Sequence, residues 1–106
     1  MMAYNLTSPR SGRPVANQYE IEDKGTVYFQ SYRTLIAKKT GATYTISSNW
    51  DYSRTTAKYF YEWLRGYGFN EYEIDELKKW LRKPSRKHGD RINDFVNQTI
   101  EYVEEL

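Results

Sequence analysis

The stretch from Trp50 to Leu64, WDYSRTTAKYFYEWL, decides how the rest of the chain is read. It begins as an aromatic turn and continues as an amphipathic helix, for which Ser53 is the predicted N-cap and Gly66 the predicted left-handed C-terminal residue. Five side chains recur at the spacing of one helical face: Thr56, Tyr59, Phe60, Trp63 and Leu64. We therefore expect this face to lie on a sheet, with strands before it in the chain and helices after it.

The segment before this helix, residues 15–48, has the pattern of an antiparallel β-meander. Tyr19 and Ile21 alternate with polar residues, which is the period-two pattern of a half-buried strand. A bulge or break is expected near residues 30–33, where the alternation slips. Turns containing Gly25 and Gly41 then divide the segment into about three strands, near residues 17–22, 26–38 and 43–47.

Residues 1–14 have a different composition from the rest of the chain. They combine two arginines with five residues that disfavour packed elements: Ser8, Pro9, Ser11, Gly12 and Pro14. The sequence therefore predicts a flexible or extended basic N-terminal arm at residues 1–14. One α+β domain follows over residues 15–106.

The part after the opening stretch, residues 53–106, is predicted to be helical. Asn70 and Glu73 have the spacing of a capping box at the start of a second helix, and Pro84 prevents its continuation. Asp90 is the candidate N-cap of a last helix with one apolar face formed by Ile92, Phe95, Val96, Thr99 and Val103. The predicted fold is α+β, an antiparallel β-meander of about three strands followed by about three helices packed on one face.

Composition excludes several kinds of chemistry. The chain has no cysteine, which removes disulfide and thiolate chemistry, and its only histidine, His88, has too few neighbouring ligands for a metal site. No phosphate-binding glycine loop or nucleophile elbow is present. No segment has the length and hydropathy of a membrane helix. We expect a cytoplasmic protein that is not an enzyme, needs no cofactor or metal, and has no membrane partner.

The sequence contains more large aromatic residues than a domain of this size can bury. Eleven tyrosines and three tryptophans occur among 106 residues. One interpretation is an aromatic core with hydroxyl groups at its rim. The other is an exposed face of the residue types that dominate protein-binding hot spots. For this second interpretation the candidate partner-binding residues are Trp50, Asp51, Tyr52, Tyr32 and Arg33.

A basic segment over residues 78–91 is the second candidate contact surface. Its cations could neutralise phosphates or an acidic protein surface. A solvated helix end is the competing interpretation, since the net charge is only +2 and acidic residues lie one turn earlier. The candidate residues for contact with nucleic acid or an acidic surface are Lys78, Lys79, Arg82, Lys83, Arg86, Lys87 and Arg91.

The octapeptide RGYGFNEY at residues 65–72 is similar to the RNA-binding octamer of RRM domains. In those domains the octamer lies on a central strand, where its aromatic residues stack on bases. Here it joins two predicted helices. We therefore interpret it as a helix end, a loop and a capping box.

Several short motifs between Arg10 and Tyr59 resemble a family of small proteins encoded by bacteriophages and prophages of Gram-positive bacteria. The matching segments are RSGR at 10–13, NQY at 17–19, YFQSY at 28–32 with IA at 36–37, and WDYS at 50–53 with TT at 55–56 and KY at 58–59. The resemblance implies a phage or prophage origin, and it implies no activity.

From these observations we expect a non-enzymatic, phage-encoded binding protein that acts as a monomer or small homo-oligomer. Its partner would be a host or defence protein, which it would inhibit in the manner of an anti-CRISPR protein. The alternative is a phage accessory protein that binds DNA or RNA through the basic segment at 78–91.

Overall fold

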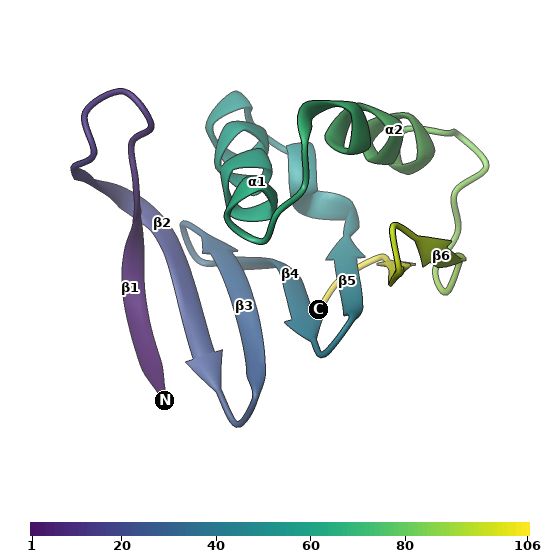
Figure 1. Cartoon of the computed structure of the whole chain (residues 1–106), viewed down its shortest axis with the longest axis horizontal. Coiled ribbons are helices and arrows are strands. Elements are labelled where there is room, and N and C mark those ends of the chain that lie inside the picture. The colour runs from purple at the N-terminus through teal and green to yellow at the C-terminus, as the bar shows by residue number, and fades with distance from the viewer.

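One seven-stranded mixed sheet organises the chain (Figure 1), and the computed structural model describes all 106 residues. Five consecutive strands are antiparallel neighbours: β1 (Met2–Thr7), β2 (Pro14–Asp23), β3 (Thr26–Ser31), β4 (Thr34–Thr40) and β5 (Thr43–Ser47). Beyond β5 the last strand, β7 (Gln98–Val103), pairs in parallel, and β6 (Arg91–Phe95) pairs antiparallel with β7 at the far edge. The spatial order is therefore β1-β2-β3-β4-β5-β7-β6.

The helices lie between β5 and β6 in the chain. A 3₁₀ turn, η1 (Ser48–Asp51), leads into α1 (Arg54–Gly66), and α2 (Glu71–Leu81) follows after a short loop. Both predicted N-caps are confirmed: Thr56 N donates to Ser53 Oγ at 3.1 Å, and Asn70 and Glu73 form the reciprocal capping box. The left-handed residue after α1 is Gly68 (φ +96°) and not Gly66.

A single core of 15 buried residues lies between one face of the sheet and the two helices. The indole of Trp63, only 2% exposed, stacks near Phe29 and Phe60 with ring centroids 6.2 and 6.5 Å away, and the Tyr44 ring meets it edge-on at 5.9 Å. The helical face predicted to pack on the sheet is therefore confirmed as the centre of the core. Aromatic rings fill the space that a larger aliphatic core would otherwise occupy.

The predicted last helix is wrong, because residues 91–103 form the β6–β7 hairpin. Ile92, Phe95 and Val103 fit a helical face by spacing, but the chain reverses at Val96 and Asn97, which both have positive φ. Ile100 is fully buried and lies beside Tyr44 of β5. Pairing with the open edge of β5 thus overrides the local helical pattern, and the fold has two helices instead of three.

The sheet also has more strands than the sequence predicts. Residues 26–38 were predicted as one long strand with a bulge or break near 30–33, and at Tyr32 and Arg33 the chain turns back completely to start β4. Within the N-terminal segment expected to be flexible or extended, residues 2–7 form β1 and pair with β2. These two segments and the C-terminal hairpin account for seven strands where about three were expected.

In β2 the polar side chains face the helices and the apolar side chains face away from them, which is the reverse of the usual pattern. Its polar row faces the helices: Gln18 is fully buried, and the Glu20 carboxylate accepts hydrogen bonds from Trp63 Nε1 at 3.0 Å and Tyr67 Oη at 2.7 Å. Because successive side chains of a strand point to opposite faces, Tyr19 and Ile21 lie on the face that no helix covers.

The β6–β7 turn provides a test of backbone strain. Val96 and Asn97 are the two central residues of a two-residue hairpin loop, with φ of 52° and 65°. A β-branched residue is disfavoured at positive φ, whereas Asn-Gly is the preferred pair in such turns. Replacing Val96-Asn97 by Asn-Gly is expected to stabilise the protein by about 1 to 2 kcal/mol. Urea denaturation measures this, and an unchanged or lower midpoint would show that the turn stores no strain.

Candidate functional site

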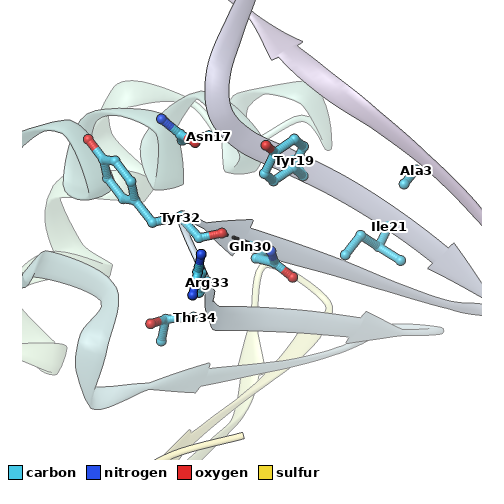
Figure 2. Close-up of a pocket in the computed structure, with 8 residues that line it drawn as sticks. All are labelled: Ala3, Asn17, Tyr19, Ile21, Gln30, Tyr32, Arg33 and Thr34. Carbon is cyan, nitrogen blue, oxygen red and sulfur yellow. Dashed lines mark hydrogen bonds between the residues drawn. The ribbon is translucent and has the colours of Figure 1, made fainter.

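An open groove of about 730 Å³ lies on the uncovered face of the sheet (Figure 2). Residues of β1, β2, β3, the β3–β4 turn and the start of β4 line it, and they are Ala3, Asn17, Tyr19, Ile21, Gln30, Tyr32, Arg33 and Thr34. The groove therefore crosses four neighbouring strands of the N-terminal half of the sheet. Its volume lies within the range typical of ligand pockets, but the groove is open and shallow.

The apolar surface of the groove continues into a neighbouring hollow of about 270 Å³. The two hollows share Ile21 and Gln30, and the second adds Tyr28 and Leu35. Cross-strand pairing explains this continuity, because Ile21 lies opposite Tyr28 and Gln30 lies opposite Leu35. A row of half-buried aromatic and aliphatic side chains thus runs across β2, β3 and β4 on the face without helices.

One end of the groove is formed by the turn between β3 and β4. Tyr32 is 43% exposed, and its ring meets that of Tyr52, 50% exposed, edge-on with centroids 6.5 Å apart. Arg33 is exposed beside them and has no carboxylate partner. This end therefore presents two tyrosines and one unpaired guanidinium to solvent, residue types that recur at binding hot spots.

The backbone at this end is held in an uncommon conformation. Asn17 and Tyr32 have φ of 68° and 56°, and Tyr32 N donates to Asn17 O at 2.7 Å. The side-chain amide of Gln30 donates to Tyr32 O at 2.8 Å. Tyr32 occupies the first position of a two-residue hairpin loop, where positive φ ordinarily selects glycine. Strained backbone of this kind, held in place by surrounding hydrogen bonds, is frequent at functional sites.

The structure brings together three of the five predicted partner-binding residues. Tyr32, Arg33 and Tyr52 meet at the end of the groove, but Trp50 is a core residue with only 2% exposure. The Arg82 guanidinium lies 5.4 Å above the Trp50 ring. Asp51 is exposed and makes no capping hydrogen bond, because Ser53 caps α1. Within the Trp-Asp-Tyr-Ser motif, Trp50 therefore packs in the core, Ser53 caps α1, and Asp51 and Tyr52 are exposed.

The predicted basic segment does not form one unpaired surface. Four of its seven cations have carboxylate partners within 4 Å, in the pairs Lys78–Asp75, Lys79–Glu76, Arg86–Asp90 and Arg91–Glu101. The Arg86 side chain is also structural, since its guanidinium lies 3.9 Å from the Trp80 ring centre and donates to Trp80 O. Arg82, Lys83 and Lys87 remain without a carboxylate partner. The charge available to a phosphate backbone is correspondingly small.

Cations and aromatic residues of this segment do meet in one hollow of about 450 Å³ between α2 and β6. Lys79 and Lys83 line it together with Trp80, Ile92, Phe95 and Glu76. Lys79 is paired with Glu76, however, and Arg86 already covers the Trp80 ring. The hollow therefore offers a ligand one lysine without a carboxylate partner, Lys83, because the Trp80 ring is already covered by Arg86.

The octapeptide at residues 65–72 joins the two helices, as its interpretation as a helix end, a loop and a capping box predicts. It contains the last turn of α1, the loop and the start of α2, so none of its residues lies on a strand. Arg65 pairs with Glu62 and Glu71 at this junction. Its side chains support the helix connection and do not form a stacking platform.

No group of three or more histidine and carboxylate side chains is arranged to hold a metal ion. His88 Nδ1 accepts a hydrogen bond from Glu104 N at 3.2 Å, which ties the loop before β6 to the C-terminal segment. Neither helix combines the length and the hydropathy needed to cross a membrane.

Most of the groove cannot be predicted from the sequence. The pattern of Asn17, Tyr19, Ile21 and Gln30 predicts strands but no binding role, because the sequence does not say which face of a strand the helices cover. One signal is present in the sequence: Tyr19 and Ile21 on one strand are followed by Tyr28 on the next strand. These side chains form a continuous surface only after the two strands pair in register.

Comparison with known proteins assigns the chain to a family but not to an activity. Residues 2–81, which include the groove and both helices, match DUF8033, described as a family of unknown function. Neither the curated proteins nor the solved structures contain a significant match. The chain therefore belongs to the DUF8033 family.

Proposed function

We propose that the protein is a non-enzymatic binding protein whose recognition surface is the groove on the uncovered face of β1–β4, together with Tyr52. The observation that carries the proposal is the placement of Tyr19 and Ile21. They stand on the solvent side of β2 while Gln18 and Glu20 occupy the side under the helices. An apolar row on the solvent side, with polar residues inside, is costly unless something covers it.

A protein partner fits the groove better than a small substrate does. The groove is open to solvent, and its exposed end has tyrosines and an arginine, the composition of interface hot spots. Given the phage origin that the sequence motifs imply, the partner would be a host or defence protein, inhibited in the manner of an anti-CRISPR protein. An accessory role in DNA or RNA binding is less favoured, because carboxylates neutralise four of the seven cations on which it depends.

A substitution at Tyr32 tests the binding surface without an expected loss of stability. Tyr32→Gly removes the ring and also relieves the positive φ, so the variant is expected to be as stable as the wild type or more stable by about 1 kcal/mol. Combined with Arg33→Ala, it should weaken partner binding by about tenfold or more. Affinity capture from nuclease-treated host lysate would identify the partner, and the purified pair would then be titrated calorimetrically.

A charge-reversed variant provides the matched control. Lys83→Glu with Lys87→Glu alters two cations of the basic segment that have no carboxylate partner and leaves the groove intact, so it should bind the partner about as tightly as the wild type. Full binding by the Tyr32→Gly, Arg33→Ala variant would contradict the proposed surface. Loss of binding in the charge-reversed variant alone, with salt-dependent affinity for single-stranded or duplex DNA, would support the nucleic-acid alternative.

A further inference from the structure

The two edges of the sheet are protected to very different degrees. At one edge β6 is only five residues long, carries Arg91 and Asp94, and has an irregular register between Ile92 and Phe95. These are devices by which natural sheets prevent further strands from pairing. At the other edge β1, MAYNLT, has no charged residue and no proline, and its only register shift comes after Asn5. Its outer backbone groups are free to pair.

Exposed apolar side chains concentrate at the same edge. Three of the eight large hydrophobic side chains that the fold leaves exposed belong to the first four residues: Met1 (91%), Met2 (61%) and Tyr4 (43%). Met2, Tyr4 and Leu6 point to one face of β1, because alternate residues of a strand share a face. An unpaired strand edge and the exposed side chains of Met2 and Tyr4 therefore coincide on β1, next to Leu6, which is half-buried against the core.

We propose that two copies of the chain associate through their β1 strands, which pair antiparallel about a two-fold axis and continue the sheet from one subunit into the other. The sequence of β1 is complementary to itself. An axis at Tyr4 places Tyr4 opposite its own copy and Met2 opposite Leu6, so apolar residues meet and no like charges face each other. A charged peptide would find no counter-charge along this strand, which favours a second copy as the occupant.

The association is independent of the proposed function but affects its geometry. Ala3 of β1 lies at the rim of the groove, so pairing through β1 would place the grooves of the two subunits side by side on one continuous sheet face. A dimer would then present two recognition surfaces to a partner, and a repeated or dimeric partner would bind with increased avidity.

The mass of the protein in solution tests the pairing. Light scattering after size exclusion should give twice the 12.7 kDa of one chain. Replacing Met2 and Tyr4 together by lysine should give monomers, because lysines block edge pairing. Within the chain these lysines would lie opposite Glu22 and Glu20 of β2, so the fold should persist, as circular dichroism would verify. A wild type that stays monomeric, or a double variant that stays dimeric, would overturn the proposal.

The matched control for that variant changes exposed residues outside β1. Tyr72 and Val96 are two other exposed hydrophobic residues, on α2 and on the β6–β7 turn. Replacing both by lysine makes the same change of charge and removes the same number of exposed apolar side chains. This control should remain dimeric, and its conversion to monomer would show that the effect of the β1 variant is not specific to that edge.

Cross-linking defines the register, because the chain contains no cysteine of its own. Single cysteines would be introduced at Ala3, Tyr4 and Asn5, with Tyr72→Cys as the control. A residue on the two-fold axis faces its own copy across about 4.5 to 5.5 Å between Cα atoms, which a disulfide can span. One of the three should form a disulfide dimer much faster than its neighbours under mild oxidation. Rates no higher than that of the control at all three positions would contradict β1 pairing.

Discussion

Trp63→Ala is expected to destabilise the fold by about 3 to 5 kcal/mol, a large fraction of the stability of a domain of this size. The indole is almost completely buried at the junction of β3, β5 and α1, and its loss would leave a cavity beside Phe29, Phe60 and Tyr44. It would also deprive the Glu20 carboxylate of one of its two donors. Urea denaturation followed by circular dichroism measures the effect.

Two further variants separate the contributions to this loss. Trp63→Phe retains most of the apolar volume but removes the Nε1 donor, so it should cost roughly 1 to 2 kcal/mol less than the alanine variant. Tyr72→Ala, at a side chain that is 73% exposed, should change stability by no more than about 0.5 kcal/mol. A Trp63→Ala protein as stable as Tyr72→Ala would refute the placement of α1 on the sheet.

Stability is expected to fall steeply at alkaline pH, with Tyr44 as a principal cause. Its ring is fully buried, its hydroxyl has no hydrogen-bond partner, and burial raises the pKa of Tyr44 to about 12. The unfolded chain loses this proton near pH 10, whereas the folded chain keeps it until about pH 12. The stabilisation is thus fully present below pH 10 and declines by about 2 to 3 kcal/mol as the pH rises through that interval.

Tyr44→Phe should remove this part of the pH dependence. At neutral pH the variant should also be about 1 kcal/mol more stable, because phenylalanine has no hydroxyl to leave buried without a partner. Burial and the hydrogen bond to Glu20 also raise the pKa of Tyr67, so some alkaline sensitivity should persist until Tyr67 is replaced as well. Urea midpoints at about pH 8 and about pH 11 compare the variants, and an equal loss in wild type and Tyr44→Phe would contradict this assignment.

Local signals in the sequence predict the two helices correctly, but they also predict a third helix where the chain forms the β6–β7 hairpin. The caps at Ser53 and Asn70 depend only on neighbouring residues, and the apolar face of α1 repeats with a helical period, so both could be read directly. The segment from Asp90 to Val103 satisfies the same rules by coincidence. Its strands form because the edge of β5 needs a partner, and that requirement exists only in the assembled sheet.

The candidate site could be predicted only at its most exposed end. Tyr32, Arg33 and Tyr52 were identified by residue type, whereas Tyr19 and Ile21 looked like the buried half of an ordinary strand. Their position on the uncovered face accompanies that of Glu20, whose carboxylate accepts hydrogen bonds from Trp63 and Tyr67 on the inner face of β2. Hydrogen bonds between residues more than forty positions apart in the sequence thus help to fix which face of β2 is left without a helix.

The parallel pairing of β5 with β7 has a consequence for how the chain folds. Strands β1–β5 are joined by short turns and can form as the chain emerges from the ribosome, but Tyr44 and Ile100 meet only after 56 further residues have been made. Contacts between residues so distant in the sequence are slow to form. Until β7 arrives, the growing chain presents β5 as an open edge. A chaperone acting during synthesis would therefore have this edge as a target, and the last hairpin removes it once β7 pairs with β5.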